Sequence, residues 1–180
     1  MPKLSPFAIS RFLSALAATA LLIILLAAGA LTPVPVPEAQ NMVESFEELV
    51  ASLTVSPAGI FFNNLVASLL MIIPALGMAL AAYIVYNTGL VIGAISTTSN
   101  TPVGLSLLIP FLTFYGFVEM LAYGFAVSES FFLTSAVVRR RFRSEMVVVP
   151  YVLGVVVLLL ALAAVIEWLL IRLFQTFLPS

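Results

Sequence analysis

Glu119 is an ionisable side chain within a long apolar stretch, and its position gives it potential for chemistry. It is the only charged residue between Val103 and Val127. A carboxylate at membrane depth is costly, so such a residue is expected to face a polar interior and to mark a functional site. Tyr115 lies four residues earlier, so in a helix the two side chains share one face. The pair is suited to ion binding, to proton transfer, or to a hydrogen bond that holds helices together.

Four further polar residues are spaced so that they could join this pair. Residues 60–95 carry no charge, and a hairpin that turns between residues 75 and 76 would place two short polar segments at one depth, about 17 Å along each arm. The predicted buried polar cluster comprises Asn63, Asn64, Tyr86, Asn87, Tyr115 and Glu119. It would serve either as an ion or solute site or as interhelical hydrogen bonds worth about 1 kcal/mol each.

The composition indicates the elements that position these residues. Of the 180 residues, 63% are hydrophobic and 8% are charged, and neither cysteine nor histidine occurs. This predicts a single all-α membrane domain, a polytopic transmembrane helical bundle. It excludes disulfides, thiol nucleophiles, imidazole bases and the usual zinc sites. A carboxylate with a tyrosine lacks a nucleophile–base pair, so we expect no enzymatic activity and no cofactor.

Hydropathy and charge together predict five crossings. They lie at about 7–30, 58–75, 77–96, 103–127 and 147–174. The first resembles a signal peptide but is longer than the apolar region of one, which favours an uncleaved anchor. Lys3 and Arg11 place the N-terminus in the cytoplasm of a cell-membrane protein and the C-terminus outside. A tight central hairpin over 60–95 places the arginines at 139–143 in the cytoplasm as well. A single long bent helix over 60–95 also satisfies hydropathy, but it does not satisfy this preference of arginine for the cytoplasmic side.

Two connecting segments carry most of the charge. A proline run at 33–37 is expected to be extended, and an amphipathic helix with a wholly acidic polar face is expected at 38–54, outside the membrane. A basic cytoplasmic connector is expected at 128–146. Its four arginines are candidates for contact with anionic lipid or with a partner: Arg139, Arg140, Arg141 and Arg143. Glu167 and Arg172 are expected to be interfacial.

Small residues mark a face suited to close helix packing. Gly89 and Gly93 are four residues apart in the predicted third span. Such faces let two helix backbones approach in lipid, within one chain or between copies. A homo-oligomer is therefore one of the expected partners.

The middle of the chain resembles the stage II sporulation protein M family of integral membrane proteins. The resemblance covers about residues 58–138 and rests on the order and spacing of the segments 60–64, 86–94 and 116–119, with Gly77 and Pro110 between them. It implies a small helical bundle that acts as the membrane component of a complex with peptidoglycan-degrading partners. Tyr115 stands where the family has a histidine, which weakens any proposal of metal binding at that position.

Two functions follow as expectations. The first is a non-enzymatic membrane scaffold, or a subunit of a membrane complex, whose partners are membrane lipids and either a protein or a second copy of the chain, with no nucleic acid. The second is a small transporter, channel or permease subunit that uses the Asn/Tyr/Glu cluster as a polar site.

Overall fold

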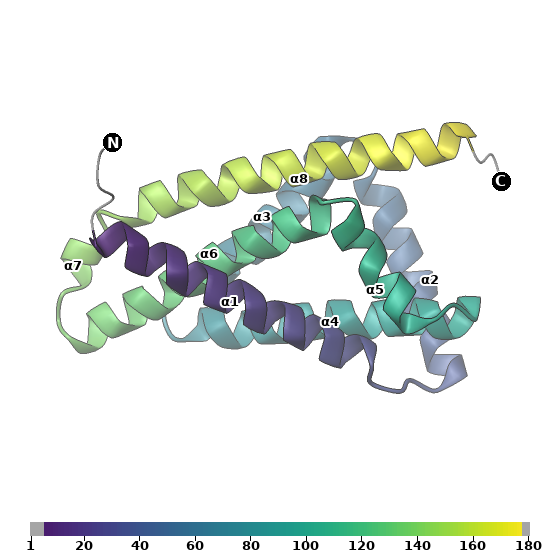
Figure 1. The fold of residues 1–180 in the computed structure, drawn as a ribbon, viewed down its shortest axis with the longest axis horizontal. Helices are drawn as coiled ribbons and strands as arrows, with labels where there is room; N and C mark the ends of the chain where they lie inside the picture. Colours follow the sequence, from purple (N-terminus) through teal and green to yellow (C-terminus); the bar gives the residue numbers. More distant parts are fainter. Residues whose placement is uncertain (1–5, 178–180) are drawn as a thin grey trace.

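The all-α prediction is confirmed. The computed structural model describes residues 6–177, which form helices and no strand (Figure 1). The helices are α1 (Pro6–Ala30), α2 (Val36–Leu53), α3 (Pro57–Ile72), α4 (Leu76–Ser99), α5 (Val103–Leu112), α6 (Tyr115–Val138), α7 (Phe142–Glu145) and α8 (Val149–Phe177).

The helices have the lengths and surfaces of a multi-pass membrane protein. Four of them, α1, α4, α6 and α8, are long and apolar enough to cross a bilayer, and α2 with α3 makes a further candidate that bends by 118° at its break. Large apolar side chains point outward along these helices: Leu21, Ile24 and Leu158 are 63%, 63% and 72% exposed. A water-soluble monomer rarely shows so much apolar surface, whereas a lipid-facing bundle requires it.

The central hairpin is a three-residue turn that is held against α6. Ala75 adopts a positive φ of 64°, and its backbone N–H donates to Oγ1 of Thr134 at 2.7 Å. Ser130 Oγ donates to the carbonyl oxygen of Ile73, also at 2.7 Å. The first bond satisfies an N–H that the turn leaves without a helical partner, whereas the Ile73 carbonyl oxygen also accepts from the N–H of Gly77 at 2.7 Å. The two bonds to α6 bring the α3–α4 turn to the end of the bundle where α6 finishes.

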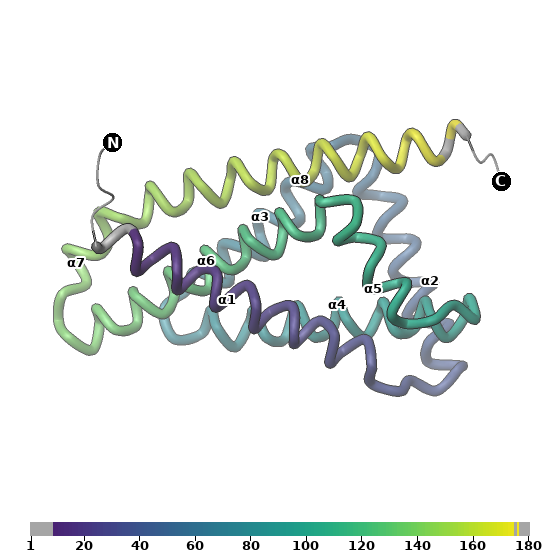
Figure 2. Tube along the Cα trace, in the orientation of Figure 1, coloured from purple at the N-terminus to yellow at the C-terminus, as the bar shows by residue number. Residues whose placement is uncertain are grey.

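Helices α1 and α4 pack backbone to backbone and run in the same direction (Figure 2). An added Cβ at Gly89 would lie 2.2 Å from the carbonyl oxygen of Leu26, and one at Gly29 would lie 2.2 Å from that of Tyr86. Gly93 approaches Ala30 in the same way. The predicted small-residue face is thus used inside the chain, between α1 and α4.

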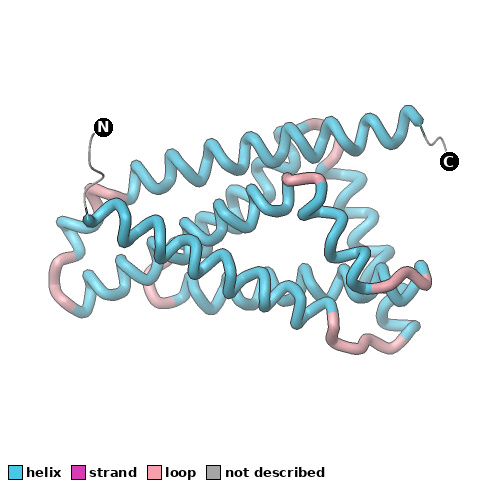
Figure 3. The backbone as a smooth tube through the Cα atoms, in the orientation of Figure 1, coloured by secondary structure: helices cyan, strands magenta, loops and turns pink. Residues whose placement is uncertain are grey.

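The boundaries differ most from expectation in the fourth predicted span. In place of one helix over 103–127, α5 ends at Leu112, the backbone turns at residues 113 and 114, and α6 continues to Val138 (Figure 3). The segment 128–138, expected to belong to a basic connector over 128–146, is therefore the second half of α6. Phe114 takes a positive φ of 65° at the break.

The remaining boundaries shift by one to three residues. Helix α2 begins at Val36, so only residues 33–35 of the proline run lie outside a helix. Pro35 keeps the expected extended conformation, with φ of −57° and ψ of 141°. Helix α4 continues to Ser99, and in its last turns Ser and Thr hydroxyls bond carbonyl groups one turn earlier, as Thr97 does to Gly93 at 2.9 Å.

Candidate functional site

Glu119 lies in the second turn of α6, and Tyr123 is its hydrogen-bond partner. The Tyr123 hydroxyl donates to Oε1 of Glu119 at 2.6 Å, and Tyr123 is 4% exposed. The two residues are four apart and share one face of α6, as do Tyr115 and Glu119. The carboxyl group is therefore held by its own helix.

A second carboxyl group reaches this place from α8. Glu167 is half-buried and interacts electrostatically with Glu119 and with both Tyr115 and Tyr123. This interaction of Glu167 with residues of α6 was not expected from the sequence. Arg172 follows Glu167 by five residues, and the central carbon of its guanidinium lies 5.4 Å from the centroid of the Trp168 ring. The acidic site is thus built between α6 and α8.

The break between α5 and α6 positions this site. Gly116 fits against α5, because an added Cβ there would lie 2.8 Å from Cβ of Pro110. In the view of Figure 1 the α5–α6 junction lies just below α8, and α6 packs extensively on α8. Glu119 therefore follows a helix break within the bundle, with Tyr115 and Tyr123 on the same face of α6.

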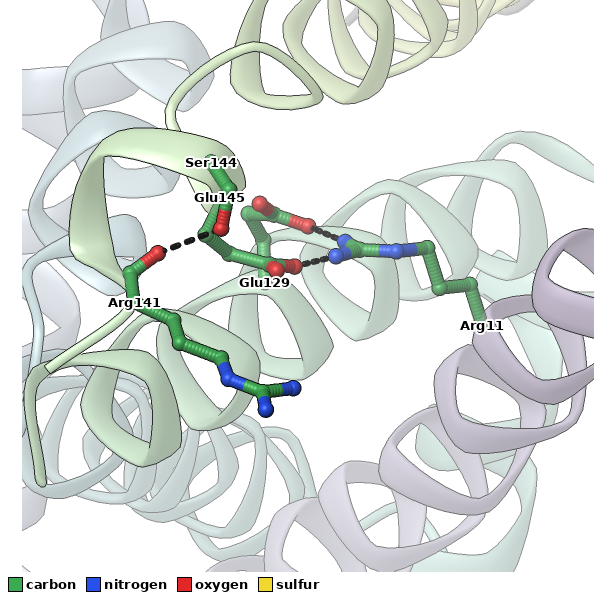
Figure 4. Close-up of polar contacts among 5 residues, drawn as sticks. All are labelled: Arg11, Glu129, Arg141, Ser144 and Glu145. Carbon is green, nitrogen blue, oxygen red and sulfur yellow. Dashed lines mark hydrogen bonds and ion pairs between the residues drawn. The ribbon is translucent and has the colours of Figure 1, made fainter. Parts of the chain in front are cut away.

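A second ionic group joins three elements at the other half of α6 (Figure 4). The guanidinium of Arg11, on α1, binds Oε2 of Glu129 on α6 and Oε1 of Glu145 on α7. Arg11 is 8% exposed and Glu129 is 1% exposed. The Arg11 guanidinium also lies 4.4 Å from the ring centroid of Phe132. We refer to Arg11, Glu129 and Glu145 as the Arg11 clasp.

The geometry of the clasp depends on arginine. A guanidinium presents several N–H donors in a rigid plane, so one side chain can bind two carboxylates at once, which a lysine ammonium does less well. Glu129 also keeps Oε1 buried without a hydrogen-bond partner. The clasp joins α1 to the second half of α6 and to α7, the short helix that follows it.

The predicted polar residues on α3 and α4 find other partners. Asn63 donates from Nδ2 to Oδ1 of Asn64 at 3.2 Å. The hydroxyls of Tyr86 and Thr32 share a hydrogen bond of 2.9 Å, and Asn87 donates to a backbone carbonyl one turn earlier in α4 at 2.7 Å. Within residues 6–177, no hydrogen bond joins these residues to one another across α3, α4 and α6. Close packing of α1 on α4 directs Tyr86 towards α1.

The predicted basic contact residues are exposed at the turn between α6 and α7. Arg139, Arg140, Arg141 and Arg143 all reach solvent. A shallow, open hollow is lined by residues 140–144. Figure 4 shows Arg141 beside the Arg11 clasp, with its backbone carbonyl oxygen accepting from Ser144 Oγ. These arginines are therefore placed to meet an anion.

Sequence reasoning missed Arg11, Glu129, Glu145, Tyr123 and Glu167 as site residues. Tyr123 was detectable, because it stands one helical turn after Glu119. Arg11 and Glu129 carried a weaker signal: each is an ionisable residue in a mostly apolar helix, where it needs an internal partner. The pairing across 118 positions could not be read from spacing.

Comparison of the chain with protein-family models, curated proteins and solved structures finds no match. Within the described residues, no group of three or more His, Cys, Asp or Glu side chains is placed to hold a metal ion.

Proposed function

We propose that the protein is a non-enzymatic membrane scaffold, a multi-pass subunit of a membrane complex. The observation that carries this proposal is the acidic face of α2. Its four glutamates are all exposed, namely Glu38, Glu44, Glu47 and Glu48, whereas Ala39 on the same helix is fully buried. Helix α2 packs on α4 and α3, so the bundle holds it and leaves the acidic face open.

The chemistry of this face favours a protein partner over lipid. Helices that lie on anionic membranes carry Lys or Arg on the polar face, and α2 carries none. Exposed acids recruit a basic surface through electrostatic complementarity, which speeds encounter and selects partners. The resemblance to the stage II sporulation protein M family supports the same proposal, because members of that family act as the membrane component of a complex. We place the protein in the cell membrane with the start of α1 on the cytoplasmic side.

Co-purification from native membranes tests the scaffold. The parent chain is expected to retain a defined protein, and the triple variant Glu44→Lys, Glu47→Lys and Glu48→Lys is expected to lose it. Gln40→Lys adds a positive charge on the same helix without removing an acid, and serves as the matched control. Isolation of the parent chain alone, or equal recovery from the parent and triple variants, would count against the proposal.

The α5–α6 break favours a second candidate, a transporter or channel subunit. Discontinuous helices near the middle of the membrane form the ion and substrate sites of many transporters. Glu119 follows such a break and interacts with Glu167 on α8. In reconstituted vesicles, Glu119→Gln is expected to abolish ion, proton or solute flux, and Glu44→Gln on the exposed acidic face is expected to leave it unchanged. Equal flux from the parent and Glu119→Gln would refute this function.

A further inference from the structure

The turn between α6 and α7 concentrates positive charge. Its four arginines are exposed within five consecutive positions, 139–143. Arg140, Arg141 and Arg143 line the open hollow at this turn together with Phe142 and Ser144. Arg140 has a φ of 54°, which reverses the chain at the end of α6 and gathers the following side chains around the hollow.

These arginines are not neutralised by the protein itself. The acid nearest in sequence is Glu145, and its carboxylate binds Arg11. Over the described residues, no carboxylate forms an ion pair with any of the four arginines of the turn. Ser144 Oγ donates to the backbone carbonyl oxygen of Arg141 at 2.7 Å. This bond holds the turn and does not involve a guanidinium group. The guanidinium groups thus remain available for an external anion.

Exposed apolar residues flank the turn on both sides. Val137 and Val138, at the end of α6, are 51% and 78% exposed. Met146 and Val147, before α8, are 44% and 66% exposed. An acidic soluble peptide would leave these four side chains in water. A phospholipid would cover them with its acyl chains while its phosphate lies at the level of the arginines.

We propose that Arg140, Arg141 and Arg143 form a binding site for the phosphate headgroup of an anionic phospholipid, with the acyl chains against Val137, Val138, Met146 and Val147. Guanidinium groups bind phosphate oxygens through paired N–H donors, which gives geometric selectivity beyond charge. The site therefore binds a phosphatidylglycerol molecule more tightly than a zwitterionic phosphatidylcholine. This site is separate from the acidic face of α2, so either proposal can fail alone.

Binding of a fluorescent phosphatidylglycerol to the purified full-length protein in neutral detergent tests the site. Detergent removes any effect of the arginines on membrane orientation. We expect the triple variant Arg140→Gln, Arg141→Gln and Arg143→Gln to bind about 100-fold more weakly, since each arginine near an anionic surface contributes about fivefold. Arg172→Gln removes an exposed arginine from the far end of α8 and is expected to bind as the parent does. The triple lysine variant at the same three positions keeps the charge but loses the paired donors, and is expected to bind more weakly than the parent and more tightly than the glutamine variant.

Competition experiments identify the source of the anion. Unlabelled phosphatidylglycerol is expected to displace the probe, and phosphatidylcholine is not. Equal displacement by the two lipids, displacement by inorganic phosphate at the same concentration, or stronger displacement by an acidic peptide would each overturn the proposal. Parent-like binding by the glutamine variant, or loss of binding with Arg172→Gln alone, would also overturn it.

Discussion

Replacement of Arg11 by methionine should destabilise the bundle strongly. The substitution keeps a long apolar stem and removes the guanidinium that binds Glu129 and Glu145. Glu129 is 1% exposed, so its carboxylate would remain buried without its cationic partner. Breaking a buried ion pair by removing one partner costs about 3–5 kcal/mol. For a chain of this length, Tm should fall by about 6–20 °C, at about 2–4 °C per kcal/mol.

The measurement is thermal unfolding in detergent, followed by circular dichroism, for a double-mutant cycle. Glu129→Gln removes the buried charge, so the double variant Arg11→Met with Glu129→Gln should be more stable than the sum of the two single changes predicts. We expect a recovery of about 1.5–3 kcal/mol, the contribution of a hydrogen bond to a charged group. Arg172→Met is the matched control. It should lower the free energy of unfolding by only about 0.5–1 kcal/mol, the contribution of an exposed cation–π contact.

Two outcomes would refute this reasoning. If Arg11→Met and Arg172→Met lower Tm equally, burial of the clasp adds nothing to its strength. If the double variant loses the simple sum of the two single losses, Arg11 and Glu129 do not act as a pair.

Two further predictions follow from packing and topology. Gly89→Ala should destabilise the bundle by about 1–3 kcal/mol, because the added methyl group overpacks against α1. At Gly154 an added Cβ has no atom within 4 Å, so Gly154→Ala should stabilise α8 by about 0.5–1 kcal/mol. Equal melting temperatures for the two variants would contradict this prediction. The chain has no cysteine, so single cysteine substitutions report topology directly. An impermeant maleimide should label Asn41→Cys from one side of the membrane, and Ala75→Cys and Ser144→Cys from the other side. Labelling of all three variants from one side would refute the five-crossing arrangement.

The long apolar stretches specify their helices locally. Hydropathy predicts membrane helices for the first and last spans because a continuous run of about 20 apolar residues can satisfy its backbone in lipid only as a helix. The turn at Pro74 and Ala75 was predictable too, since proline cannot continue the bonding pattern of a helix. Tyr115 and Glu119 share a face because helical geometry alone requires it.

The α5–α6 break left a weaker signal, because Pro110 and Gly116 flank the turn but do not stand in it. Residues 113 and 114 are Thr and Phe, and neither is a helix breaker of the kind that glycine or proline is. Hydropathy over 103–127 stays apolar through the break, so it cannot distinguish one helix from two. Across the break, Gly116 packs closely against Pro110, a contact between two helices that hydropathy does not report.

The sequence by itself determined the class of protein, most of the helical segments and the residues that must find a polar partner, because burial cost and helix periodicity act locally along the chain. Only the tertiary structure decided which partners they find. Helix rotation is set by packing, as where Gly29 and Gly89 bring α1 and α4 into backbone contact, and rotation determines which side chains meet. Glu119 therefore bonds Tyr123 on its own helix in place of the asparagines of α3 and α4, and Arg11 reaches Glu129 across 118 positions.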